Sequence, residues 1–123
     1  MILHDSMAVY LGLDVGTSGV KAILVAASGE VRASAVTPLS LSTPKPGWAE
    51  QDPDAWWAAS VASIKSVLAQ SPNSAGVAFG ISGQMHSSVF LDAGGEVIRP
   101  ALLWCDGRTT AECQEITALA GGE

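Results

Sequence analysis

Short apolar runs separated by turn residues occupy the first forty positions of the chain. Ala8–Leu13 and Val20–Ala27 are apolar and partly β-branched, and Val31–Leu41 continues the pattern. Between these runs lie Gly16-Thr17-Ser18-Gly19 and Ser28-Gly29, whose residue types favour tight turns. The pattern predicts three strands joined by tight turns, which is an antiparallel meander.

A helix is predicted after the Pro-rich loop at 43–47. Asp52-Pro53-Asp54 indicates its start, because Asp is a favoured N-cap and Pro suits the first helical position. Apolar residues at helical spacing predict its buried face: Trp57, Val61, Ile64 and Leu68. Ser71-Pro72-Asn73 ends the helix. Gly76–Ser82 then predicts a strand that lies parallel to its neighbour, because a helix crossover precedes it.

The last third of the chain alternates short apolar runs with turns. A break at Gly83–His86 is followed by a hairpin around Asp92-Ala93-Gly94-Gly95, and Ala101–Trp104 is one more apolar run. Thr109-x-x-Glu112 predicts a capping box at the start of a last helix. The predicted order is β-β-β-α-β, then a hairpin, then β-α.

Composition narrows the classes of function. The 123 residues include 12 acidic and 6 basic side chains, for a formal charge of −6. This balance argues against a nucleic-acid binder, which normally presents a basic face. The sequence contains neither an apolar run near the roughly 18 residues of a membrane span nor a secretory signal pattern. Cys105 and Cys113 lie eight residues apart, without the CxxC spacing or the nearby His of a metal site. This fits two reduced thiols, so we expect a cytoplasmic protein.

Charged residues are scarce for a domain of this size. They make up 15% of the chain, whereas about 25% is usual. Two explanations stay open. The surface is rich in Ser, Thr and Gly, or further chain covers part of it.

A carboxylate, a turn of small residues and a lysine follow one another in Gly12-Leu13-Asp14-Val15-Gly16-Thr17-Ser18-Gly19-Val20-Lys21. Backbone N–H groups in such a turn can form a concave anion site, and the hydroxyls add donors. Asp14 could hold Mg²⁺, which prefers oxygen ligands, and Lys21 could balance phosphate charge. An ordinary Gly-rich hairpin with a solvated Asp fits the same residues.

A polar segment, Ser82-Gly83-Gln84-Met85-His86-Ser87, follows the predicted parallel strand. Open α/β sheets place ligands at the carboxyl ends of such strands. Gln and neutral His side chains each donate and accept hydrogen bonds, which suits a polyhydroxylated ligand. The alternative is a loop in which His86 is a structural residue.

A third candidate, Trp104-Cys105-Asp106-Gly107-Arg108, combines an aromatic ring, an acid and a guanidinium. Such a ring can cover the apolar face of a sugar while the charged groups orient its hydroxyls. The alternative is an ion pair between Asp106 and Arg108 beside a core Trp. Trp56 and Trp57 are more typical of core and interface packing.

Taken together, four segments resemble the amino-terminal part of the FGGY carbohydrate kinases. They are GLDVGTSGVKAIL, GWAEQDPDAWW, GISGQMHS and RPALLWCDGRTTAEC, in the family's order over roughly Val9 to Cys113. Within the family, the QMH tripeptide and the CDGR segment are similar to those of members that phosphorylate D-xylulose. Members that act on glycerol carry an Arg-Glu pair in place of Met-His, whereas members that act on gluconate can show Met-His.

The resemblance implies an α/β fold of the actin-like, ribonuclease H-like ATPase type. This chain would be an incomplete amino-terminal portion with a β-β-β-α-β start. The resemblance also implies ATP and Mg²⁺ as cofactors and transfer of the γ-phosphate to the 5-hydroxyl of D-xylulose. Ribulose and gluconate stay open as substrates. A truncated, non-catalytic module that binds an anion or a partner chain stays open as another class.

The resemblance also assigns residues to the site. Asp14 falls on the carboxylate that serves Mg²⁺ and phosphate. Gly16, Thr17 and Ser18 fall on the first phosphate-binding turn. Met85 and His86 fall on the sugar-binding tripeptide, and Trp104, Asp106 and Arg108 lie on the loop near the sugar. With Lys21 and Gln84, which their own chemistry indicates, the expected cofactor-binding residues are Asp14, Gly16, Thr17, Ser18 and Lys21, and the expected substrate-binding residues are Gln84, Met85, His86, Trp104, Asp106 and Arg108.

Members of the family are several times longer than this chain. Their catalytic base is an Asp near the start of a second domain, so the resemblance implies a base and an adenine pocket beyond Glu123. We therefore expect residues 8–123 to form a partial amino-terminal domain, without the carboxy-terminal kinase domain that would complete the enzyme. Homodimerisation of the full-length protein stays open. We expect residues 1–7 to be a disordered tail and Met7 to be a plausible start.

Overall fold

The computed structural model describes residues 8–121, apart from the side chain of Val77. The expected tail at residues 1–7 lies outside this range. The described chain forms two compact units. The first consists of residues 8–40 and 53–85, and the second of residues 41–52 and 86–121.

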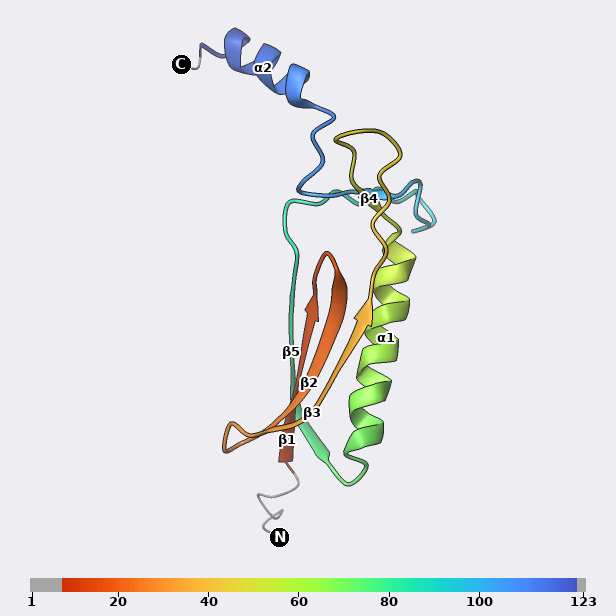
Figure 1. The fold of residues 1–123 in the computed structure, drawn as a ribbon, viewed down its shortest axis with the longest axis vertical. Helices are drawn as coiled ribbons and strands as arrows, with labels where there is room; N and C mark the ends of the chain where they lie inside the picture. Colours follow the sequence, from red (N-terminus) through yellow and green to blue (C-terminus); the bar gives the residue numbers. More distant parts are fainter. Residues whose placement is uncertain (1–7, 122–123) are drawn as a thin grey trace. The chain divides into compact units, whose positions relative to one another are not determined.

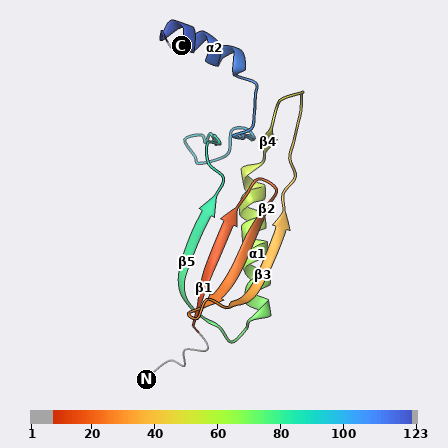
Figure 2. The same ribbon diagram turned by 60° about the vertical axis from the view of Figure 1, so that its left-hand side comes forward.

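The first unit is built on a four-stranded sheet (Figures 1 and 2). Its strands are β1 (Ala8–Val15), β2 (Gly19–Ala26), β3 (Val31–Pro38) and β5 (Ala75–Gly83), in the order β3-β2-β1-β5. β2 pairs antiparallel with both β1 and β3, and β5 pairs parallel with β1. The predicted meander and the predicted parallel strand are both confirmed.

β3 ends earlier than the apolar pattern predicts. The pattern continues to Leu41, whereas the strand stops at Pro38. The Leu39 N–H donates to the carbonyl oxygen of Ser18 at 3.0 Å, so the chain bends there toward the β1–β2 turn. The other turn, between β2 and β3, is as predicted. Gly29 has a φ of +89°, and its N–H donates to the carbonyl oxygen of Ala26 at 2.9 Å.

Helix α1 (Pro53–Gln70) packs on one face of the sheet, mainly against β2 and β3. The predicted buried face is wrong at two of its four positions, because Trp57 is 74% exposed and Leu68 is 47% exposed. Val61 and Ile64 are half-buried, and Ile64 packs against the core. The buried helix residues are mostly small: Ala59, Ser60, Ser63 and Val67. Small side chains let the helix lie close to the strands. The buried Ser63 hydroxyl accordingly lies 2.9 Å from the carbonyl oxygen of Val20 and 2.7 Å from Thr37 Oγ1.

The core of the first unit lies between α1 and the middle of the sheet. It contains Val9, Leu13, Val20, Ala22, Leu24, Ala33, Ala59 and Val67. β5 forms one edge of the sheet, beyond the strands that α1 mainly contacts. Its Phe79 and Ile81 side chains are therefore exposed, at 56% and 67%.

The second unit has less regular structure. Its two-residue strands β4 (Glu50–Gln51) and β6 (Ala101–Leu102) pair antiparallel, and β4 was not predicted. The hairpin predicted around residues 92–95 forms, with Gly95 at a φ of +86°, but it is closed by one bridge, between Leu91 and Val97.

Helix α2 (Thr110–Leu119) begins where the sequence predicts a helix, but without the predicted capping box. Thr109 has φ −100° and ψ 17° and makes no side-chain cap hydrogen bond. An N-cap residue normally has an extended backbone, which aims its side chain at the first turn. The Thr110 hydroxyl instead donates to the carbonyl oxygen of Gly107 at 2.7 Å.

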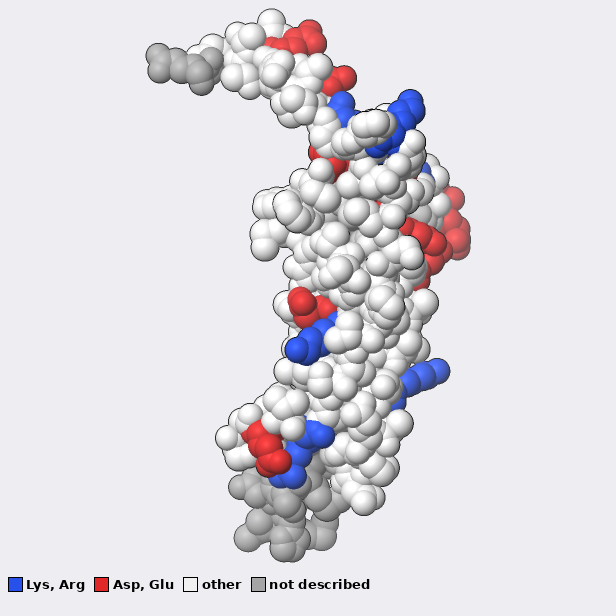
Figure 3. Space-filling view, in the orientation of Figure 1, with Lys and Arg blue, Asp and Glu red and all other residues white. Residues whose placement is uncertain are grey.

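Charged side chains form a few small groups on the face that Figure 3 shows, and most of that face is uncharged. This agrees with the low content of charged residues. Within residues 8–121, no helix is both long and apolar enough to cross a membrane.

Candidate functional site

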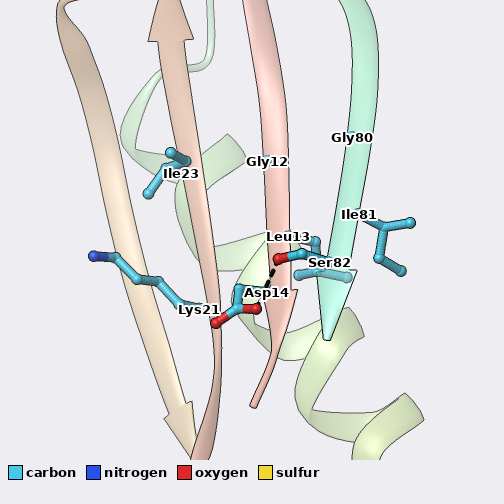
Figure 4. Close-up of a pocket in the computed structure, with 8 residues that line it drawn as sticks. All are labelled: Gly12, Leu13, Asp14, Lys21, Ile23, Gly80, Ile81 and Ser82. Carbon is cyan, nitrogen blue, oxygen red and sulfur yellow. Dashed lines mark hydrogen bonds between the residues drawn. The ribbon is translucent and has the colours of Figure 1, made fainter. Parts of the chain in front are cut away.

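Three neighbouring strands of the first unit bring three polar side chains into register. Asp14 on β1 is paired with Lys21 on β2 and with Ser82 on β5. The Ser82 hydroxyl donates to Asp14 Oδ1 at 2.7 Å, whereas the Lys21 amine extends away from the carboxylate (Figure 4). The three residues line an open cavity of about 390 Å³. The other lining residues are Gly12, Leu13, Ile23, Gly80 and Ile81.

The turn between β1 and β2 is tight, and its small residues permit this. The Gly16 N–H donates to the carbonyl oxygen of Gly19 at 3.1 Å. A Cβ atom on Gly19 would lie only 2.9 Å from the carbonyl oxygen of Thr37, so this position requires glycine. Ser18, between the two glycines, is exposed.

The segment that follows β5 is joined to this turn. The Gln84 N–H donates to the carbonyl oxygen of Val15 at 2.9 Å. The Thr17 hydroxyl donates to Gln84 Oε1 at 3.0 Å, across 67 positions of sequence. Two segments that the sequence indicates as separate candidates therefore meet in one place. Ser82 adds a third contact between them, through Asp14.

Met85 and His86, the next two residues after Gln84, are both exposed. Met85 is the last residue of the first unit and is 67% exposed. His86 is the first residue of the second part of the other unit, and its side chain is also exposed. Its φ is +60°, which makes it the one non-glycine residue with a positive φ in the described part of the chain. Histidine adopts this region several times more often than most residues do.

In the second unit, Asp106 and Arg108 form an ion pair, which is the predicted alternative to a direct role of these two residues in sugar binding. Asp106 Oδ1 accepts hydrogen bonds from the backbone N–H of Arg108 at 3.0 Å and from its Nε at 2.8 Å. Asp106 Oδ2 accepts from Arg108 Nη2 at 2.7 Å and from the Ala49 N–H at 2.6 Å. The hydrogen bonds from the Arg108 guanidinium hold the pKa of Asp106 well below its usual range. The same hydrogen bonds raise the pKa of Arg108.

Two residues that sequence analysis did not select, Glu50 and Trp48, complete this ion-pair cluster. Arg108 Nη2 donates to Glu50 Oε1 at 2.7 Å, and Arg99 Nη2 donates to the same oxygen at 3.2 Å. The Trp48 ring stacks on the guanidinium, with Arg108 Cζ 3.7 Å from the ring centroid. The only signal for these residues in the sequence is their place in the GWAEQDP segment.

The ring beside the ion pair is thus Trp48, whereas Trp104 is 60% exposed. Of the predicted site residues, the structure brings Thr17 and Gln84 together in the first unit and Asp106 and Arg108 together in the second. Asp14 and Lys21 lie opposite each other on the adjacent strands β1 and β2.

The exposed Asp14 carboxylate is a suitable ligand for Mg²⁺ that binds together with a phosphate group. Residues 8–121 contain no cluster of three or more His, Cys, Asp or Glu side chains that could hold a metal. Mg²⁺ is, however, commonly bound through only one or two carboxylates together with phosphate oxygens and water. One exposed carboxylate is therefore a sufficient protein contribution.

Comparison with known proteins agrees with the resemblance. The model of the amino-terminal domain of the FGGY family of carbohydrate kinases matches residues 9–123. The xylulose kinase of Klebsiella pneumoniae is 49% identical over 105 residues, which cover 85% of this chain and 22% of that protein. The chain therefore spans about a fifth of the length of this relative.

Solved structures show the same similarity. The xylulose kinase from Rhodospirillum rubrum superposes with a TM-score of 0.84 at 36% identity, over 88% of this chain and 22% of that one. A gluconate kinase from Lactobacillus acidophilus also gives a TM-score of 0.84, at 29% identity, over 90% of this chain and 22% of that one. The neighbours bear out the actin-like ATPase fold that the resemblance implies, for its amino-terminal portion.

Proposed function

Because the chain belongs to the FGGY family of carbohydrate kinases, we propose that it is the amino-terminal part of an ATP-dependent kinase for D-xylulose. The hydrogen bond between Thr17 and Gln84 carries this proposal. It joins a turn suited to phosphate to a segment suited to a sugar. A kinase needs this arrangement, because the phosphate donor and the acceptor hydroxyl must lie side by side.

In the proposed reaction, the 5-hydroxyl oxygen of xylulose forms a bond to the γ-phosphorus of ATP. The bond from that phosphorus to the bridging oxygen breaks and releases ADP. The hydroxyl proton passes to a carboxylate, which the family resemblance leads us to expect beyond residue 123. Such reactions depend mainly on positioning and on neutralisation of charge.

On the phosphate side, we assign binding of phosphate oxygens to the turn at Gly16, Thr17 and Ser18. Asp14 would hold Mg²⁺, which when bound neutralises charge on the phosphates. Lys21 lies opposite Asp14 on β2 and adds positive charge to the same cavity. Ser82 would orient the Asp14 carboxylate through their hydrogen bond.

On the sugar side, we assign Gln84, Met85, His86 and Trp104 to the substrate. The side chains of Met85, His86 and Trp104 are exposed. Support for xylulose comes from the QMH tripeptide and from a relative of 49% identity that is a xylulose kinase. Gluconate is the competing substrate, because a gluconate kinase is equally similar in fold.

The test uses the complete reading frame that contains these residues, together with a chimera. In the chimera, the 105 matched residues of this chain replace their counterparts in the Klebsiella pneumoniae xylulose kinase. ADP release is measured with D-xylulose, D-ribulose, D-gluconate and glycerol. We expect the highest kcat/KM with D-xylulose.

A preference for D-ribulose or D-gluconate in both proteins would reassign the substrate. A folded complete protein without activity on any of the four would favour a non-catalytic binding module. If the complete protein is active and the chimera is not, the loss of activity comes from the junction between the two sequences in the chimera.

A further inference from the structure

The Asp106 carboxylate in the second unit is occupied by protein groups. Each of its two oxygens accepts two hydrogen bonds, and its side chain is only 5% exposed. The Arg108 side chain is 12% exposed and contacts Asp106, Glu50 and the Trp48 ring. Little of either group is left for a sugar hydroxyl. A role in holding the protein itself explains these contacts better.

What this network holds is the loop from Leu103 to Arg108. The Leu103 N–H donates to the carbonyl oxygen of Ala49 at 3.0 Å, and the Gly107 N–H donates to that of Gly47 at 2.8 Å. Both ends of the loop are therefore tied to the same short segment, residues 47–50. The 60% exposed Trp104 side chain stands between these two attachments.

We propose that Trp48, Glu50, Asp106 and Arg108 form a clamp that positions Trp104 for the sugar. Glu50 is the central member, because it joins Arg108 to β4, and its own side chain is only 10% exposed. The function of the clamp in sugar binding rests on the proposed function. The fixing of Trp104 does not.

Electrostatics make the clamp sensitive to the loss of one charge. Glu50 and Asp106 are both acidic, and Arg108 donates to both. Glu50→Gln leaves Arg108 paired with Asp106, but it removes the carboxylate that ties Arg108 and Arg99 to β4. Losing a hydrogen bond between charged, mostly buried groups costs more than losing an exposed ion pair. Glu30 and Arg32 supply the matched exposed pair, at 61% and 39% exposure and 3.3 Å separation.

The first experiment does not depend on activity. Fluorine NMR spectra are recorded on the complete protein labelled with 5-fluorotryptophan, and the Trp104 signal is assigned with Trp104→Phe. We expect Glu50→Gln to shift and broaden the Trp104 signal, and Glu30→Gln to leave it unchanged. An unchanged Trp104 signal in Glu50→Gln would overturn the clamp. If Glu50→Gln does not fold, Arg108→Lys takes its place, because Lys keeps the charge but loses the paired geometry.

The second experiment asks whether the clamp acts through Trp104. We expect Glu50→Gln to raise the KM for the sugar about tenfold, equivalent to about 1.4 kcal/mol, and to change the KM for ATP less than about twofold. In a Trp104→Phe background, Glu50→Gln should add almost no further rise, because residues that act as one unit are not additive. Full additivity would show that Glu50 acts elsewhere and would overturn the proposal.

The two experiments separate the two proposals. A Trp104 signal that responds while the sugar KM does not would keep the clamp and remove Trp104 from the sugar site. An inactive complete protein would remove the proposed function, and the fluorine spectra would still decide whether the clamp exists.

Discussion

The Asp14 carboxylate is exposed and has one hydrogen bond to Ser82, so it is available to a metal ion and to phosphate. In the active complete protein we expect Asp14→Asn to lower kcat by about 10²–10³-fold, the usual cost of losing one preorganised charge contact. The KM for the sugar should change little, because Asp14 serves the phosphate side. Steady-state kinetics at saturating MgATP measure both quantities. Glu30→Gln is the control, and wild-type kcat in Asp14→Asn would exclude this role.

His86 combines a role proposed for its side chain with an unusual backbone. We expect His86→Ala to raise the KM for the sugar and to leave kcat within a few fold, because a ground-state contact is lost. One neutral hydrogen bond is worth about 0.5–1.5 kcal/mol, so the rise should be about 2- to 12-fold.

The φ of +60° at this position requires a second variant of His86. Asn tolerates positive φ about as well as His, so His86→Asn removes the ring without straining the backbone. A similar rise in KM in both variants assigns the effect to the side chain. A rise in His86→Ala alone would assign it to the backbone.

Asp106 should make stability depend on pH in acid. Its pKa is lowered from an ordinary value of 3.8 by the hydrogen bonds from Arg108, so below that value the unfolded chain binds more protons than the folded one. The stabilisation is therefore complete above about pH 4 and is lost as the pH falls further. In urea titrations of the chimera, Asp106→Asn should be less stable at pH 7. It should also lose less stability than the parent between about pH 4 and pH 2. Parallel curves for the two proteins would contradict this account.

Helix α1 is attached to the sheet by small polar residues, and this gives a test at the scale of elements. The buried Ser63 hydroxyl is hydrogen-bonded to β2 and β3. We expect Ser63→Ala to lower the free energy of unfolding by about 1–3 kcal/mol, because partner groups stay buried and unpaired. Ser63→Leu should cost at least as much through overpacking. Trp57→Ala is the control, with a change within about 0.5 kcal/mol because Trp57 is 74% exposed. Urea titration of the chimera measures all three, and a larger effect at Trp57 would restore the face that the sequence predicts.

The elements differ in how far local sequence determines them. Short apolar runs and turn residues predict β1, β2, β3 and β5, because each strand carries its own pattern. The buried face of α1 was predicted only in part, because burial depends on how closely the helix approaches the strands. Apolar spacing does not contain this information. The two-residue strand β4 has no pattern of its own and forms through its pairing with β6 and, at Glu50, with Ser42.

The same distinction applies to the site. Asp14 and the turn after it can be recognised from consecutive residues. The contact between Thr17 and Gln84 spans 67 positions and needs the parallel pairing of β1 and β5 before it can form. Glu50 and Trp48 were missed because a Glu and a Trp near a helix start look like solvated and packing residues. Their role depends on Arg108, which lies far along the chain.

On the scale of the whole molecule, the edge strand β5 leads us to expect self-association. β5 presents the exposed Phe79 and Ile81 beside an unpaired strand edge, a combination that promotes association. Residues 1–123 expressed alone should therefore elute from size-exclusion chromatography as mixed oligomers, and Ile81→Lys should increase the monomer fraction. The matched control is Ile116→Lys, which changes an equally exposed apolar residue on α2.

The same preparation should release no ADP with D-xylulose, because the chain spans about a fifth of its relatives and we expect the catalytic base beyond it. A monodisperse monomer with xylulose-dependent ADP release would contradict both expectations.

The parallel pairing of β1 with β5 has a consequence for synthesis on the ribosome. β1 and β2 can form their hairpin as soon as both have emerged, but the other edge of β1 has no partner until residues 75–83 follow. At about 5–20 residues per second, the roughly 60 residues between β1 and β5 take several seconds to appear. During that interval the nascent chain exposes a strand edge that ends at Val15, directly after Asp14. Slower codons within 53–74 would lengthen this exposure, and binding of a chaperone to the β1–β2 hairpin would be most useful at that stage.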